Sequence, residues 1–288
     1  MGRVVLMTEP RLVSVIVATR DRPKLLGEAL ASIRALEGPD LKFEILVGDN
    51  GGLPESKEVA DRFDAIHQYT PKNYCPAPRN LAMRRATGEF IAFLDDDDLW
   101  LPGHIRTHIK LLDANPDFAG VFGQIVSTDP DLNPLDDPWP KEVPGDGDFF
   151  MMIGDSDWDW QIRIAADRKF GFAAVPCVLF RQRPIGTFNT MQLQRSAFTR
   201  RIFLRHAISH RRRWPGWKAW IRSYYACQTY YWLYFLDVAS QRSEAGERWG
   251  VIKALSSAFW IIPSRTLRSI FSDSGFRQAT ASIFQSTK

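Results

Sequence analysis

The chain has 288 residues, of which 45% are hydrophobic and 24% charged, the composition of a globular protein with room for one large α/β domain or a smaller domain with an appendage. Its three cysteines are odd in number and have no metal-type spacing, which argues against a disulfide framework and favours a reducing, cytoplasmic setting. No apolar run is long enough for a transmembrane helix or for the core of a signal peptide, so neither is expected.

The net charge of +4 is unevenly distributed along the chain. From Met191 onward there are 16 Lys and Arg against four acids, a net charge of +12, so the preceding residues carry −8. The basic part is also rich in Trp and Tyr. This split predicts two domains with different roles, residues 1–190 and residues 191–288.

The first domain alternates predicted strands and helices. A strand rich in β-branched residues is predicted at 12–18, and a helix begins at Pro23. Further strands are predicted at 43–47, 65–69, 89–94, 118–126 and 172–180. The second domain is predicted to be helical at 192–210, 219–238 and 249–262, with a polar, basic tail after Pro263. The fold class is therefore α/β with a C-terminal helical extension.

Four consecutive carboxylates follow the strand predicted at 89–94. They are Asp95, Asp96, Asp97 and Asp98, and apolar residues resume directly after them. Like charges packed this closely repel one another, and their desolvation is costly unless a cation is present. Ligands of open α/β sheets bind beyond the carboxyl ends of the strands, and oxygen ligands suit Mg²⁺ or Mn²⁺. The alternative is an acidic surface turn, but the apolar strand before it favours a cation site.

Other candidate site residues lie in loops and at helix starts. Asp49 ends the second strand and precedes two glycines, so it is either a ligand contact or part of a plain turn. Arg79 lies in the first turn of a helix, where it could face phosphate or only solvent. A helix is predicted to begin near Asp157, whose carboxylate is a candidate general base or an N-cap.

His104 and His108 share a helix face, and we expect surface histidines there instead of metal ligands. The Pro-rich stretch 128–148 is predicted to be a mobile loop.

Five segments, in this order and spacing, resemble the family 2 glycosyltransferases of GT-A fold. They are VSVIVATRDR at 13–22, ILVGDNG at 45–51, APRNLA at 77–82, GEFIAFLDDDDLW at 88–100 and SDWDWQIR at 156–163. The resemblance implies a Rossmann-like mixed sheet flanked by helices.

The resemblance also implies a role for individual residues. Asp97 and Asp95 would hold the metal as a DxD element, and Asp157 would be the catalytic base. Thr19 and Arg20 would line the nucleotide pocket, and Asp49 would hydrogen-bond the base. Arg79 and Asn80 would lie near the nucleotide or the diphosphate. The full set of substrate-binding residues implied is Thr19, Arg20, Asp49, Arg79, Asn80, Asp95, Asp96, Trp158 and Asp159.

The function implied is inverting transfer of a sugar from a nucleotide-diphospho-sugar, typically UDP-linked, to a hydroxyl of a glycan or a lipid-linked acceptor. A nucleotidyltransferase is an alternative, but residues 19–24 lack the Gly-rich, Lys-containing loop that it needs. A non-catalytic binding module on the same fold is another alternative. The basic, aromatic extension suits peripheral contact with the cytosolic face of a membrane, or else packing on the domain or a homodimer interface. Nucleic acid is not expected as a partner.

Overall fold

The computed structural model of the protein describes residues 9–72, 76–141, 163–164, 167–182, 189–209 and 217–272. The chain divides into two compact units. The first contains residues 1–143 and 168–182, and the second contains residues 144–167 and 183–288. The domain boundary at residue 190 stays a prediction.

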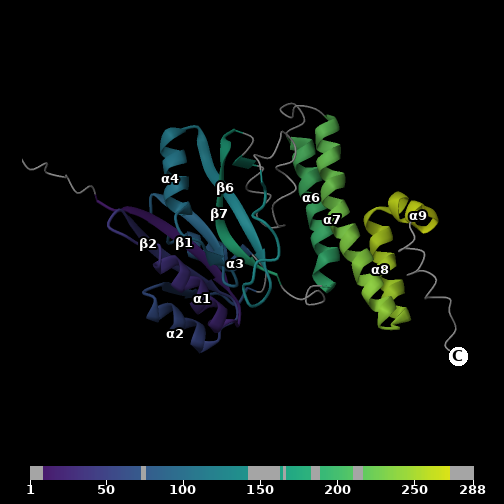
Figure 1. Ribbon diagram of the computed structural model, residues 1–288, viewed down its shortest axis with the longest axis horizontal. Helices are drawn as coiled ribbons and strands as arrows, with labels where there is room; N and C mark the ends of the chain where they lie inside the picture. Colours follow the sequence, from purple (N-terminus) through teal and green to yellow (C-terminus); the bar gives the residue numbers. More distant parts are fainter. Residues whose placement is uncertain are drawn as a thin grey trace, which may run out of the picture. The chain divides into compact units, whose positions relative to one another are not determined.

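The first unit alternates strands and helices, as the sequence predicts (Figure 1). Its elements are, in chain order, β1 (Arg11–Thr19), α1 (Pro23–Arg34), β2 (Leu41–Asp49), α2 (Pro54–Arg62), β3 (Ile66–Tyr69), α3 (Pro76–Met83), β4 (Phe90–Asp95), β5 (Leu99–Trp100), α4 (His104–Ala114), β6 (Phe118–Thr128) and β7 (Lys169–Arg181). The strand β5 has no counterpart among the predicted elements. The helix α4 begins at His104, directly after Gly103, which adopts a left-handed conformation with φ of 84°.

The strands form two sheets. Four of them pair in the order β3-β2-β1-β4, and every pair is parallel. The other sheet has the order β5-β7-β6, with β6 parallel and β5 antiparallel to β7. The order of the larger sheet is that of a Rossmann-like half, in which the carboxyl ends of neighbouring strands meet at one edge. The predicted mixed α/β architecture is thereby confirmed.

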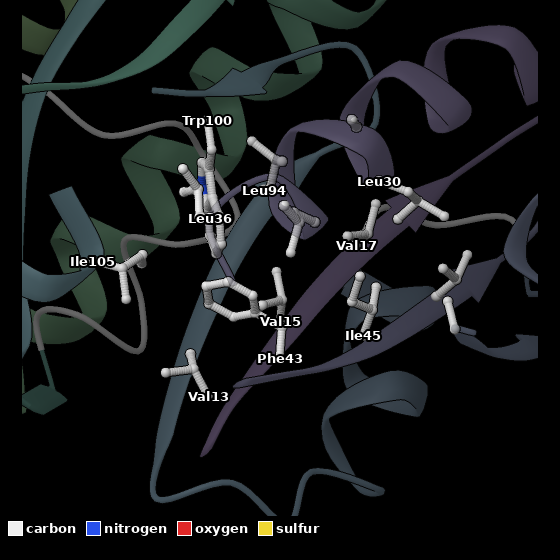
Figure 2. Packing of buried hydrophobic residues seen from close by; sticks show 14 of the residues in the cluster. Val13, Val15, Val17, Leu30, Leu36, Phe43, Ile45, Leu94, Trp100 and Ile105 are labelled. Atoms are coloured by element: carbon white, nitrogen blue, oxygen red, sulfur yellow. The ribbon is translucent and has the colours of Figure 1, made fainter. Parts of the chain in front are cut away.

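Alternation along β1 separates two hydrophobic layers. Val13, Val15 and Val17 face a core that includes residues of α1, α2 and α4. Ile16, between them in sequence, packs on the opposite face with Ala82 of α3. Because β1 is covered on both faces, its sequence is a continuous apolar run. Figure 2 shows the larger layer with Phe43 and Ile45 of β2 and Leu94, Trp100 and Ile105 beyond β1.

The stretch after β6 folds back on that strand over its described part, residues 129–141. Trp139 pairs with Ile125, and Pro134 pairs with Thr128. The Asp129 carboxylate accepts hydrogen bonds from the backbone N–H of Asn133 and from its side chain, both at 2.9 Å. This part of the predicted loop is therefore attached to β6 by isolated backbone bridges.

The second unit contains four described helices, α6 (Asn189–Ser209), α7 (Trp217–Glu244), α8 (Arg248–Ile261) and α9 (Pro263–Ser272). The sequence prediction for this region is confirmed for the first three and incomplete for the last, because Pro263 both ends α8 and begins α9. The core between α6, α7 and α8 contains Phe203, Trp232 and Ile261. No helix among the described residues is both long enough and apolar enough to span a bilayer.

Candidate active site

The register of the parallel sheet gathers polar residues at its carboxyl edge. Thr19 at the end of β1 is the register partner of Asp49 at the end of β2. On the other side of β1, Ala18 is the partner of Asp95 at the end of β4. Three strand ends therefore meet where open α/β sheets bind their ligands.

The four consecutive aspartates after β4 lie in different surroundings. Asp95 is exposed, whereas Asp97 and Asp98 are buried and Asp96 is 0% exposed. Alternate carboxylates at the end of a strand point to opposite sides, and the turn at Asp96 and Asp97 adds a further change of direction. The run is therefore not a uniform acidic surface turn.

Three of these carboxylates converge. One oxygen each from Asp95, Asp97 and Asp98 lies within 4.8 Å of the other two. An all-oxygen set with two buried members fits the preference of Mg²⁺ or Mn²⁺. Asp95 and Asp97 are the metal ligands expected from the sequence, and Asp98 is a third candidate that sequence reasoning missed.

Burial shifts the two buried carboxyl groups of the cluster toward the neutral form. It raises the pKa of Asp98 to about 8, although the backbone N–H of Arg181 donates to that carboxylate at 3.0 Å. It also raises the pKa of Asp97, against the opposing effect of Arg22. A nearby cation favours the ionised form of such groups, so the cluster has the electrostatics of a cation site.

Arg22 holds the aspartate that stands outside this cluster. Its Nε donates to Asp96 at 3.1 Å, its Nη2 donates to the other oxygen of the same carboxylate, and its Nη1 lies 3.4 Å from Asp97. The Thr19 hydroxyl also donates to Asp96, at 2.7 Å. Burial nevertheless outweighs these contacts and raises the pKa of Asp96 to about 6. Asp96 thus faces protein groups, and its assignment as a substrate contact stays a prediction.

Arg79 lies beside the exposed member of the cluster. Its guanidinium forms an ion pair with Asp95 from the first turn of α3. Gly48 of β2 permits this placement, because a Cβ there would lie 2.1 Å from the carbonyl oxygen of Pro78. The structure therefore brings Arg79 to the cluster edge, whereas Asn80 is exposed on the same helix.

Asp49 is engaged by the turn that follows it. Its Oδ1 accepts hydrogen bonds from the backbone N–H of Gly51 at 2.7 Å and Gly52 at 3.3 Å, and its Oδ2 lies 3.1 Å from Nε2 of His67. Gly51 also packs closely against Asp21, since a Cβ on Gly51 would lie 2.1 Å from the Asp21 carboxylate. Asp49 therefore shapes the loop next to the cluster, and its contact with a nucleotide base stays a prediction.

Arg20 and the segment at 157–159 are the remaining predicted site residues. Arg20 is exposed in the loop after β1, 3.8 Å from the Asp21 carboxylate. Asp157, Trp158 and Asp159 lie outside the described residues, and their roles stay predictions.

The prediction that both histidines lie at the surface is wrong, since neither is exposed. His104 is buried, with its Nδ1 at 2.7 Å from the carbonyl of Leu101, and its ring stacks edge-on against Trp100. His108 lies 3.4 Å from the Cys177 sulfur. Burial lowers the pKa of His108 to about 4 and raises the pKa of Cys177 to about 12, so both are neutral and do not form a thiolate–imidazolium pair. The apolar packing of α4 on β7 explains why both rings face inward.

Residues 14–185 match the family model described as Glycosyl transferase family 2. The matched segment is more than half of the chain and includes every strand end described above. The chain belongs to glycosyl transferase family 2.

Curated relatives of this family 2 chain match it over part of their length. GalNAc(5)-diNAcBac-PP-undecaprenol beta-1,3-glucosyltransferase of Campylobacter jejuni is 38% identical over 124 residues, which are 41% of this chain and 38% of the relative. Succinoglycan biosynthesis protein ExoM of Rhizobium meliloti is 30% identical over 106 residues, which are 33% of this chain and 34% of the relative. The chain thus spans well under half of the length of both relatives.

Solved structures share the fold of this family 2 chain. TarS 1–349 of Staphylococcus aureus, in complex with UDP-GlcNAc, superposes with a TM-score of 0.62 at 14% identity. The match covers 94% of this chain and 88% of the TarS chain. The mannosyltransferase PcManGT of Pyrobaculum calidifontis, in complex with GDP-Man and Mn²⁺, has a TM-score of 0.50 at 16% identity. The match covers 98% of this chain and 89% of the PcManGT chain. The predicted GT-A fold is confirmed.

Proposed function

We propose that this chain transfers a glycosyl group, with inversion, from a nucleotide-diphospho-sugar to a hydroxyl group of a glycan or lipid-linked acceptor. The observation that carries the proposal is the convergence of Asp95, Asp97 and Asp98 at the carboxyl edge of the sheet in a family 2 chain. The donor proposed is UDP-linked, in keeping with the UDP-GlcNAc bound by the structural neighbour TarS.

The chemistry needs positive charge near the leaving group and a base on the opposite face of the sugar. Mg²⁺ or Mn²⁺ held by Asp95, Asp97 and Asp98 would offset the charge that develops on the departing diphosphate. Arg79, which pairs with Asp95 at the N-terminus of α3, adds a guanidinium and helix N–H groups that favour phosphate. Asp157 is proposed as the general base that removes the acceptor proton, on the strength of the family resemblance.

The substrate pocket is proposed to include the loops after β1 and β2. Arg20 lies in the first of these loops, and Thr19 and Asp49 are the last residues of the two strands. Asp49 orders the second loop through Gly51 and Gly52. An ordered backbone next to the cluster supports a binding role, since positioning requires little loss of loop entropy on binding.

The acceptor is proposed to be lipid-linked, because the relative from Campylobacter jejuni is named as acting on an undecaprenol-linked substrate. This acceptor would place the enzyme in the cytoplasm, peripheral to the cytosolic face of a membrane. The basic, aromatic composition of residues 191–288 supports the same location.

A screen of nucleotide-sugars with the purified chain tests the proposal. We expect one donor to release its nucleoside diphosphate in the presence of Mn²⁺, and Asp157→Asn to lower the turnover number by about 10²-fold or more while leaving donor binding intact. Asp61→Asn, on the exposed face of α2, is the matched control and should retain turnover. Donor binding without turnover in the unmutated chain, with every donor and acceptor tried, would instead favour a binding module.

A further inference from the structure

The helix α8 carries two highly exposed tryptophans on one side. Trp249 is 83% exposed and Trp260 is 73% exposed. They are eleven positions apart, which is close to three full turns at 3.6 residues per turn, so both indoles project from the same side. Lys253, one turn after Trp249, and Ser256 are exposed on that side as well. These four residues are called the α8 tryptophan face.

The opposite side of α8 already has its packing partner. Its buried residues lie roughly half a turn away from the tryptophans and are Val251, Ala254, Ala258 and Ile261. The first two pack with Val238 and Ala239 of α7, which runs alongside α8 (Figure 1). The tryptophan face is therefore not needed to attach α8 to its own unit.

The charge around this face is mainly positive, since the nearest described acid, Glu247 just before α8, is paired with Arg242. Between Arg248 and Ser272 the sequence contains four bases and no acid. Lys253 lies within the face, and Arg268 is exposed on the next helix, where Leu267 is 49% exposed. Large indoles combined with an excess of basic side chains are typical of helices that lie in the interface of an anionic bilayer.

This charge pattern distinguishes a bilayer from a second copy of the chain. A two-fold dimer would place the same face on both partners, and this face contains the base Lys253 and no acid to pair with it. An anionic lipid surface supplies the opposite charge, and its headgroup region accepts the polar edge of an indole while the acyl boundary accepts the ring.

We propose that the α8 tryptophan face binds the surface of an anionic bilayer, with Trp249 and Trp260 inserted at the headgroup level and Lys253 contacting lipid phosphate. The inference deepens the proposed function by naming the surface that brings the enzyme to a lipid-linked acceptor. It concerns a different unit of the chain from the aspartate cluster, so the two can be tested apart.

The test is co-sedimentation of the full chain with phosphatidylcholine vesicles that contain or lack phosphatidylglycerol. We expect binding to the anionic vesicles only. Trp249→Ala/Trp260→Ala should lower the partition coefficient about tenfold or more, since burial of one large apolar side chain contributes at least about that factor. Lys253→Glu should lower it about fivefold or more. Trp139→Ala, at a 47% exposed tryptophan of the first unit, is the matched control and should bind like the unmutated chain.

Two results would overturn the inference. One is equal vesicle binding by the unmutated chain and the double tryptophan variant, with both folded by circular dichroism. The other is a dimer in sedimentation velocity without lipid that the double variant abolishes, which would assign the face to a second copy. UDP binding in solution should be unchanged in the double variant. If the unmutated chain did not bind UDP, the proposed function would be contradicted, whereas the vesicle result would still stand.

Discussion

Arg22 and Asp96 form a two-point ion pair beneath the aspartate cluster. The guanidinium reaches both oxygens of a carboxylate that is 0% exposed, and its third nitrogen lies 3.4 Å from Asp97. Arg22 thus offsets the charge of Asp96, the one aspartate of the run that is not part of the cluster of Asp95, Asp97 and Asp98. Arg22 is also the residue before α1, so the start of this helix is tied to the end of β4.

Loss of this guanidinium should be costly. Arg22→Gln removes the ion-pair partner of the buried Asp96 and leaves it the Thr19 hydroxyl, so we expect the free energy of unfolding to fall by about 2 to 3 kcal/mol. Arg22→Gln/Asp96→Asn should recover at least about 1 kcal/mol of this loss, because the buried charge is then absent. Urea unfolding in EDTA measures both. Equal stability of Arg22→Gln and the unmutated chain would show that the pair does not hold the turn.

Gly48 should tolerate no side chain. A Cβ there would lie 2.1 Å from the backbone carbonyl of Pro78, so Gly48→Ala must displace α3 and is expected to cost about 2 to 3 kcal/mol. The displacement would also move Arg79 away from Asp95. Gly27→Ala in α1 is the matched control, since its Cβ meets only Val59 at 3.6 Å, and it should stabilise the chain by about 0.5 to 1 kcal/mol. Thermal unfolding compares the two, and a neutral Gly48→Ala would contradict the observed packing.

His108 should make the first unit sensitive to acid. Burial lowers the pKa of His108 to about 4, below the ordinary value of 6.5, so the unfolded chain binds the proton more readily. The stabilisation is therefore fully present above about pH 6.5 and is lost as the pH falls toward 4. Between pH 7 and pH 5 this group should lower the free energy of unfolding by about 2 kcal/mol.

His108→Gln removes the titrating ring and serves as the comparison. The variant should lose less stability than the unmutated chain between pH 7 and pH 5, whatever its absolute stability at pH 7. Urea midpoints at the two pH values give the difference. Identical pH dependence in both proteins would show that His108 is not held neutral by the fold.

Much of the fold follows from local sequence pattern. The β-branched run of β1 and the apolar run of β4 predict buried strands, and the carboxyl ends of those strands give the position of the site. The strand β5 was missed because two residues carry no periodic signal and its pairing depends on distant β7. His104 was expected at the surface, but its burial depends on the packing of α4 against Trp100.

The roles within the site were harder to predict than its place. Asp95 to Asp98 are four identical residues, so the sequence does not indicate which carboxylates are buried. Their burial depends on the turn after β4. Arg22 lies 74 positions before Asp96, and only the folded sheet brings the two together. The pairing of Arg79 with Asp95 depends on a glycine in a third element, Gly48.

The most direct test of the central claim is a calorimetric titration of UDP in Mn²⁺ and in EDTA. The claim is that Asp95, Asp97 and Asp98 hold the cation that binds the nucleotide diphosphate. We predict that EDTA weakens UDP binding about tenfold or more, and that Asp97→Asn and Asp98→Asn in Mn²⁺ bind as weakly as the unmutated chain in EDTA. Asp61→Asn should bind like the unmutated chain. Equal UDP affinity in Mn²⁺ and EDTA, unchanged by either cluster variant, would contradict the account.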